Sequence, residues 1–198
     1  MVGNETYEGY TRVSAILDTY QPPQLIDWKI KTGKREAKRI STIATKIGSN
    51  VDAWIRADIS GMKYPKLNSV EAENCVRAYQ KWKEDYQIDA NELKAGERLF
   101  NNQSKICGEP DILNDPENMV IDIKCSGSIR ETYWLQTEWY ARELKYSKKA
   151  ILRLDKNLGI YEYEVRNISD VDMEVFNALA VIHRYFKPDQ RSDNEEEV

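Results

Sequence analysis

Three ionisable residues stand among apolar residues in the stretch GEPDILNDPENMVIDIKCSGS (108–128): Asp111, Asp122 and Lys124. The stretch is predicted to form two strands joined by a turn, and strands of this kind normally bury an apolar face. An unpaired carboxylate or ammonium group is costly to remove from water. The three side chains therefore need a partner, either one another or a metal ion.

The strand pattern also predicts where the three side chains lie. Asp122 and Lys124 are two residues apart, so they point to the same face of a strand. The turn NDPEN (114–118) would fold the preceding strand back and bring Asp111 near Asp122. Two ionised carboxylates repel, and a divalent cation relieves the repulsion. Oxygen ligands suit Mg²⁺ or Mn²⁺ better than zinc, and a nearby lysine stabilises charge on a phosphate. The pattern therefore predicts a site for phosphodiester hydrolysis.

The elements that position these residues change character along the chain. The first half has apolar residues at helical spacing, and the second half has short segments rich in β-forming residues. The expected helices are 13–20, 23–33, 34–61 (one helix, or two broken at Gly48), 69–86 with Ser69 as N-cap, 129–145 and 169–186. The expected strands are 92–101, 105–113, 118–126, 148–155 and 160–166. This order predicts an α/β (α+β) fold with a central mixed β-sheet flanked by helices.

Length and composition indicate one globular domain. The chain has 198 residues, of which 41% are hydrophobic and 31% charged. We expect a single domain over 1–188, made of a helical arm (1–68) and a core (69–188), and a disordered acidic tail over 189–198. The N-terminus lacks the pattern of a signal peptide, and no apolar run is long enough for a membrane span. The expected location is the cytoplasm of a bacterium or of a virus-infected host cell, without a membrane partner.

Charge is distributed unevenly. The net charge is −4, and the tail 189–198 alone carries −4, since it has five acidic residues and one basic residue. Between Lys29 and Lys46 there are seven basic residues and one acidic residue, a local charge of +6. Such a segment either contacts phosphates or forms an ordinary solvated helix face.

Several motifs together carry a resemblance to a known family. GEPD followed by DIK resembles the signature of the PD-(D/E)XK nuclease superfamily. LQTEWYA resembles the Q-x-x-x-Y motif of its RecB-type branch, which includes phage and CRISPR-associated exonucleases, with Gln136 and Tyr140 at the motif positions. Residues 13–33 resemble the N-terminal helical arm of that branch. The stretch IGSNVDAWI resembles a helix of the branch that contains a G-T/S-x-x-H motif. The stretch AGERLF resembles a strand of the branch that carries a glutamate, which is Glu97 in this sequence. The match follows the order of the family from Val13 to Tyr140.

The resemblance implies a restriction-endonuclease-like core and a role for each matching position. Asp111 and Asp122 would bind the metal together with the backbone carbonyl of Ile123, and Lys124 would be the catalytic lysine. Glu97 would bind the metal or a water beside it. Gln136 and Tyr140, one helical turn apart, would border the active site and DNA. The alternative for this last pair is an ordinary amphipathic helix.

One position departs from the family pattern. Asp52 stands where the relatives carry a metal-binding histidine. On a helix it shares a face with Ile55 and Ile59, which is an unusual place for a solvated carboxylate. Three readings stay open: Asp52 replaces one metal ligand by another, it alters the metal preference, or it marks a degenerate site.

Cysteine and histidine usage points away from other chemistries. The three cysteines are far apart, which fits reduced thiols and does not provide the four ligands of an iron-sulphur cluster, so we expect no cluster. The only histidine, His183, lies in the last expected helix, far along the chain from any candidate nucleophile. Ser-His or Cys-His catalysis is therefore disfavoured.

The resemblance implies a function: a metal-dependent deoxyribonuclease that uses Mg²⁺ or Mn²⁺, most simply an exonuclease acting on DNA ends or single strands. DNA contacts are expected from Lys34, Arg35, Lys38, Arg39 and Ser49, with Trp134 and Trp139 either in the core or stacked on bases. The rival is a catalytically degenerate module with this fold that binds DNA or a protein. RNA as substrate, a protein partner and an oligomer stay open.

Overall fold

The computed structural model describes residues 9–186, so the expected acidic tail 189–198 lies outside the described residues. The helices of this part are α1 (Val13–Leu17), α2 (Pro23–Thr32), α3 (Lys34–Ile59), α4 (Val70–Asp85), α5 (Glu131–Leu144) and α6 (Asp170–Phe186), with a short 3₁₀ turn at Ala90–Glu92. The strands are β1 (Thr11–Arg12), β2 (Leu93–Ala95), β3 (Leu99–Asn101), β4 (Ile106–Gly108), β5 (Ile112–Asn114), β6 (Met119–Lys124), β7 (Lys148–Leu154) and β8 (Tyr161–Asn167). Within residues 9–186, every helix is too short or too polar to span a bilayer.

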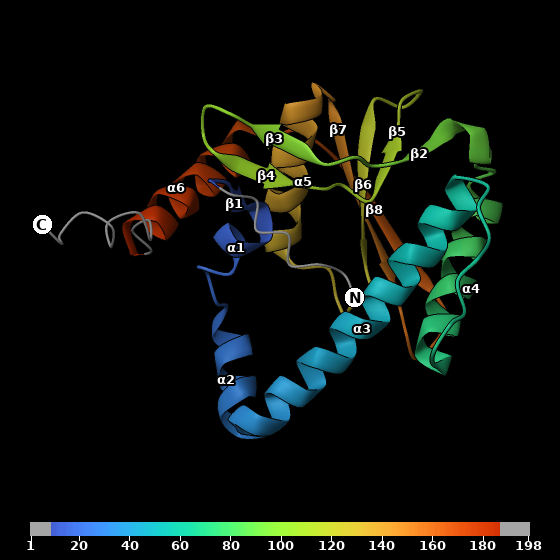
Figure 1. Cartoon of the computed structure of the whole chain (residues 1–198), viewed down its shortest axis with the longest axis horizontal. Coiled ribbons are helices and arrows are strands. Elements are labelled where there is room, and N and C mark those ends of the chain that lie inside the picture. The colour runs from blue at the N-terminus through green and yellow to red at the C-terminus, as the bar shows by residue number, and fades with distance from the viewer. Residues whose placement is uncertain (1–8, 187–198) are drawn as a thin grey trace, which may run out of the picture.

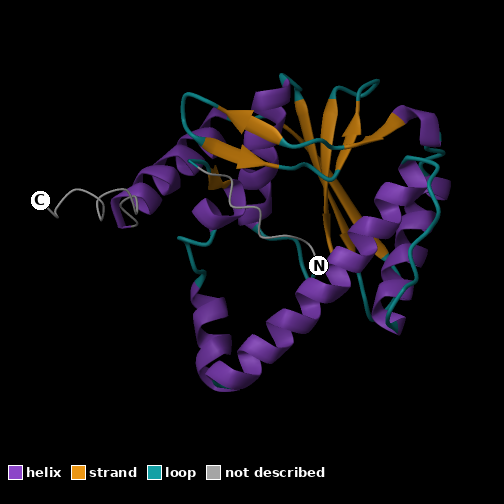
Figure 2. Cartoon of the chain, in the orientation of Figure 1, coloured by secondary structure: helices purple, strands orange, loops and turns teal. Residues whose placement is uncertain are grey.

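The strands form two mixed sheets. The larger sheet has five strands in the order β2-β5-β6-β7-β8, in which β6 and β7 are parallel and the other pairs antiparallel. The smaller sheet has the order β1-β4-β3, with β1 parallel and β3 antiparallel to β4. Helices cover the larger sheet, as Figure 2 shows. The predicted α/β fold with a mixed sheet and flanking helices is therefore confirmed.

The larger sheet lies between two helical layers, with α3 and α4 on one side and α5 and α6 on the other (Figure 1). Alternation along β6 explains why both faces are covered, since Val120 packs with Leu135 of α5 while Ile121 packs with Trp82 of α4. All four side chains are buried. Strand β6 is consequently the centre of the core, and any charge on it must be compensated locally.

Two expected strands, 92–101 and 105–113, are each divided between the two sheets. The division falls where Gly96 approaches Pro110. A Cβ atom at Gly96 would lie 2.1 Å from the carbonyl oxygen of Pro110, so only glycine fits there. Proline also lacks the amide hydrogen that a continuous ladder needs. Both strands therefore end at this crossing, and their halves pair with different partners.

Of the expected arm 1–68, the part that projects from the body is α2 and the N-terminal half of α3, and only this part is called the arm below (Figure 1). Pro23 begins α2, as its fixed φ allows, and Gly33 ends it with φ 82°. None of the α2 side chains is buried. Gly48 does not interrupt α3, so the single long helix is the alternative that the structure bears out. Ser69 caps α4 as predicted, accepting a hydrogen bond from the Ala72 amide at 3.2 Å.

Candidate active site

The hairpin of β5 and β6 brings the first two carboxylates together. Ile112 pairs with Ile121 in the antiparallel ladder, which sets Asp111 beside the end of β6. The amide of Ile123 donates a hydrogen bond to Asp111 Oδ2 at 2.7 Å. The turn at 114–118 thus produces the pairing that the sequence predicted, without help from distant elements.

Asp122 and Lys124 share one face of β6, as the strand period predicted. Lys124 Nζ lies 2.5 Å from Asp122 Oδ2, and the Asp122 residue is only 1% exposed. Lys124 is thus the cation beside Asp122, and its charge also acts on Asp111. Two carboxylates that share one ammonium group keep an excess of negative charge, which a further cation would balance.

Helix α5 supplies the groups that hold Lys124. Lys124 Nζ donates to Gln136 Oε1 at 3.0 Å, and Gln136 Nε2 donates to the Tyr140 hydroxyl at 3.1 Å. The Tyr133 ring lies 5.0 Å from the same ammonium group. Gly108 of β4 leaves space for Tyr140, because a Cβ atom there would lie 2.6 Å from the tyrosine ring. Gln136 and Tyr140 therefore border Lys124 from one helix face.

The electrostatics of the site follow from burial. Desolvation, and then the charge of Asp122, raise the pKa of Asp111 above its usual range. Desolvation also raises the pKa of Asp122, against the opposing attraction of Lys124. Burial by itself would lower the pKa of Lys124, but the charges of Asp122 and Asp111 outweigh it and raise that pKa. The lysine is therefore charged near neutral pH, while the two carboxylates resist ionisation together.

Asp52 lies on α3 and is held by an arginine one turn later. Both of its oxygens accept from Arg56 Nε, at 3.1 and 3.2 Å. Burial raises the pKa of Asp52, and Arg56 opposes the shift. The charge of Asp52 in turn raises the pKa of Asp111 and of Asp122, so the three carboxylates act on one another electrostatically.

Sequence reasoning missed Arg56 and Glu109. Arg56 donates to the carbonyl oxygens of Gly96 at 2.8 Å and Pro110 at 3.1 Å, and it pairs with Glu109 at 3.2 Å. It therefore fastens α3 to the crossing of the two sheets. The only sequence signals were the spacing of four residues between Asp52 and Arg56 and the position of Glu109 inside GEPD.

Other predicted residues lie apart from this cluster. Glu97 is exposed in the loop between β2 and β3, where it lines a depression with Ile59 and Leu113 that does not include Asp111 or Asp122. The residues predicted to contact DNA from α3 are all exposed. They are Lys34, Arg35, Lys38, Arg39 and Ser49. The suggestion that Trp134 and Trp139 stack on bases was wrong. They are 0% and 1% exposed, respectively, because both belong to the core under α5.

The donors present suit a hard cation, although the site is not fully assembled. In the part of the chain that the structure describes, no three Asp, Glu, His or Cys side chains converge as a ready metal site. Asp111 and Asp122 nevertheless provide two carboxylates that share the charge of one lysine and whose pKa values burial raises. Such an oxygen-only set favours Mg²⁺ or Mn²⁺. Asp52 is turned to Arg56 and would have to leave this partner to join them.

Comparisons with known proteins identify the fold and nothing finer. No family model and no curated protein matches the chain. Among solved structures, the protein SSO0001 is 12% identical with a TM-score of 0.52, covering 93% of this chain and 79% of that one. An alkaline exonuclease from Laribacter hongkongensis is 11% identical with a TM-score of 0.52, covering 90% and 87% respectively. Its complex with dAMP gives 11% identity and a TM-score of 0.50, with 90% and 92% covered. The chain is therefore similar in fold to exonucleases.

Proposed function

We propose that this protein is a metal-dependent DNA nuclease of the RecB-type PD-(D/E)XK branch, and that it acts as an exonuclease. One observation carries the proposal: Asp111 and Asp122 lie together on one hairpin with a single ammonium group, that of Lys124, beside them. Two carboxylates that share one cation carry an excess of negative charge, which a divalent metal ion would compensate.

Each residue of the site has a role in this proposal. Asp111, Asp122 and the Ile123 carbonyl would hold Mg²⁺ or Mn²⁺, which would supply neutralising charge and a more acidic bound water. Lys124, kept charged by the carboxylates, would donate a hydrogen bond to a phosphate oxygen and stabilise the charge that develops there. Gln136 would orient the lysine ammonium group, since it accepts from Nζ at 3.0 Å. Tyr140 would fix the rotamer of Gln136 through their hydrogen bond.

DNA as substrate is supported by charge and by fold. The exposed basic residues of α2 and α3 provide a surface for the phosphate backbone. The similar fold of an alkaline exonuclease, and of its complex with dAMP, supports exonuclease activity over cleavage within the strand.

A second candidate function has its own supporting observation. Asp52 pairs with Arg56, and no third acidic side chain in residues 9–186 converges with Asp111 and Asp122. This arrangement would suit a degenerate module that has kept the fold and the basic arm for binding DNA or a protein. Metal-dependent turnover separates the two candidates, because a binding module would show none.

The decisive test is cleavage of end-labelled single- and double-stranded DNA with Mn²⁺, Mg²⁺ or EDTA. We expect degradation in either metal, none in EDTA, and loss in Lys124→Ala. Lys148→Ala is the matched control, because Lys148 is a lysine at the opposite end of the neighbouring strand and pairs with Glu117. A ladder of single-nucleotide steps would support the exonuclease. Equal inertness of wild type and Lys124→Ala, with retained DNA binding, would overturn the proposal in favour of the binding module.

A further inference from the structure

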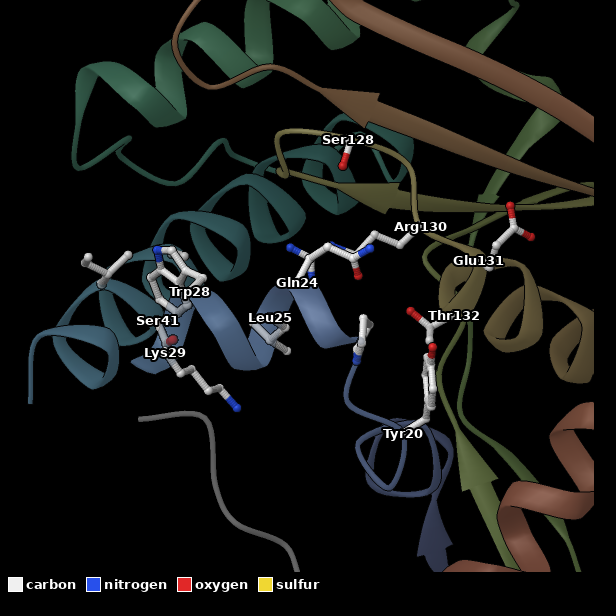
Figure 3. Close-up of a pocket in the computed structure, with 13 residues that line it drawn as sticks. Tyr20, Gln24, Leu25, Trp28, Lys29, Ser41, Ser128, Arg130, Glu131 and Thr132 are labelled. Carbon is white, nitrogen blue, oxygen red and sulfur yellow. The ribbon is translucent and has the colours of Figure 1, made fainter. Parts of the chain in front are cut away.

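A pocket of considerable size lies apart from the carboxylate cluster, since neither Asp111 nor Asp122 lines it. It has a volume of about 840 Å³ and lies between the helical arm and the loop that enters α5 (Figure 3). Helices α2 and α3 contribute Leu25, Trp28, Lys29 and Ile40. The other side of the pocket contains Arg130, and Tyr20 of the segment before α2, which lies beside Thr132 in Figure 3. A pocket that combines apolar and aromatic groups with cations suits a ligand that is both planar and anionic.

Two aromatic rings are accessible at this pocket. Trp28 is only partly covered, whereas the other four tryptophans of the chain are buried in the core. Tyr20 is 49% exposed at the same pocket. Accessible rings in a concave site can stack on a planar partner.

Positive charge surrounds the two rings. Lys29 lines the pocket directly, and further exposed basic residues continue along the arm: Lys31, Lys34, Arg35, Lys38, Arg39 and Lys46. Of these, Arg39 is paired with Glu36. The one acidic residue that lines the pocket, Glu131, pairs with Arg166 at 3.3 Å. Interleaved cations and aromatic rings are the combination that binds single-stranded nucleic acid without regard to sequence.

A continuous row of side chains connects this pocket with the proposed catalytic lysine. The Arg130 guanidinium lies 6.0 Å from the Tyr133 ring, and Lys124 Nζ lies 5.0 Å from the same ring. Arg130 immediately precedes α5, the helix that carries Gln136 and Tyr140. A strand seated between Trp28 and Arg130 would therefore pass Tyr133 on its way to Lys124.

We propose that the pocket between the arm and the start of α5 binds one unpaired DNA strand, with Trp28 and Tyr20 stacking on bases and Lys29 and Arg130 contacting phosphates. This inference deepens the proposed nuclease function and rests on it for the identity of the ligand. It names single-stranded DNA as the occupant, because a base-paired duplex does not present base faces for stacking along its length.

The test uses the distribution of tryptophans. Oligothymidylate of about 15 nucleotides, added in EDTA to prevent cleavage, is expected to quench tryptophan fluorescence through Trp28, the one tryptophan that is not buried. Trp28→Leu is expected to abolish the quenching and to raise the dissociation constant about 5- to 100-fold. Arg130→Gln is expected to weaken binding and to reduce its dependence on salt. Lys94→Gln, an exposed lysine of β2 that pairs with Asp115, is the matched control and should change neither readout.

The outcomes separate this inference from the nuclease proposal. Quenching that is lost in Trp28→Leu supports the pocket whether or not the protein cleaves DNA. Metal-dependent cleavage together with unaltered oligothymidylate binding in Trp28→Leu and Arg130→Gln would overturn the pocket and leave the nuclease intact. Equal affinity of Trp28→Leu and wild type for a blunt duplex, with no quenching by oligothymidylate, would also overturn it.

Discussion

Two groups of charged side chains contact helix α5, and they differ in how completely their charges are balanced. In the first group, Lys149 of β7 and Glu138 of α5 are both 0% exposed and lie 2.6 Å apart. Glu138 also accepts from Arg142 Nε at 2.8 Å and from the Ser169 amide, and Lys149 pairs in addition with Asp172. Every charged side chain of this group has a hydrogen-bond partner, so it joins α5, β7 and α6 without requiring a ligand.

The second group, Asp111, Asp122 and Lys124, has the same ingredients but not the same compensation. It holds two carboxylates for one ammonium group, which lies 2.5 Å from Asp122 Oδ2. Burial raises the pKa of both carboxyl groups. The group around Glu138 and Lys149 is therefore a structural ion network, whereas the group of Asp111, Asp122 and Lys124 has more negative than positive charge. A divalent cation would provide the additional positive charge.

The largest expected difference between the two groups is in catalysis. Asp122→Asn should lower DNA cleavage by about a thousandfold or more, equivalent to about 4 kcal/mol of transition-state stabilisation. In the folded protein, Glu138→Gln should leave the rate of DNA cleavage almost unchanged. Single-turnover cleavage in Mn²⁺, normalised to the folded fraction, measures both. A similar loss of cleavage rate in the two variants would contradict the assignment of one group to catalysis and the other to structure.

Stability should show the reverse order. Glu138→Gln disturbs a buried and fully bonded network, and we expect it to cost about 3 kcal/mol of unfolding free energy. Asp122→Asn relieves carboxylate repulsion while Lys124 keeps Gln136, so in EDTA it should cost much less or stabilise the protein. Urea denaturation of both variants provides the values. A larger loss in Asp122→Asn than in Glu138→Gln would contradict the comparison.

The pH dependence of stability should distinguish the carboxylate pair from its Asn variant. An unfolded aspartate has a pKa of about 4, whereas the native pKa of Asp111 and Asp122 is raised, so above about pH 4 the folded state retains protons that the unfolded state has lost. This contribution to stability therefore falls as pH rises, by at most about 1.4 kcal/mol per pH unit for each such proton. Urea titrations in EDTA should show a shallower decline for Asp122→Asn. Parallel curves would mean that the pair ionises normally.

The smallest expected effects concern two glycines. Gly108→Ala places a Cβ atom 2.6 Å from the Tyr140 ring, and we expect a loss of about 1 to 2 kcal/mol and slower cleavage because the contacts from Tyr140 to Gln136 and Lys124 shift. Gly48→Ala is the control, since no atom lies within 4 Å of its added Cβ on helix α3. It should stabilise the protein by about 0.5 to 1 kcal/mol. Thermal melts and cleavage rates of the two variants test this contrast.

Local patterns in the sequence predicted much of the fold and part of the site. The turn at 114–118 and the strand period were sufficient to place Asp111, Asp122 and Lys124 together, because the hairpin that joins them is short. Helix boundaries such as the Ser69 cap were also predictable from residue types. These features depend on residues that are close in the chain, so they can be predicted from the sequence alone.

Features that depend on distant segments could not be predicted. The division into two sheets follows from the close approach of Gly96 to Pro110, and the ion pair of Arg56 with Glu109 joins residues far apart in the chain. The choice between core and base stacking for Trp134 and Trp139 also stayed open in the sequence, because helical spacing does not reveal which face of α5 the sheet covers; the structure places both in the core. Tertiary packing decides these points.

The central claim is that the hairpin of β5 and β6, with Asp111 and Asp122, binds a divalent cation. Calorimetric titration of Mn²⁺ into metal-free protein tests this claim most directly. The account predicts that wild type binds Mn²⁺, that Asp111→Asn loses this binding, and that Asp115→Asn keeps it. Asp115 is the control because it is an exposed aspartate in the turn of the same hairpin, where it pairs with Lys94. Binding that survives unchanged in Asp111→Asn, or no binding by wild type, would contradict it.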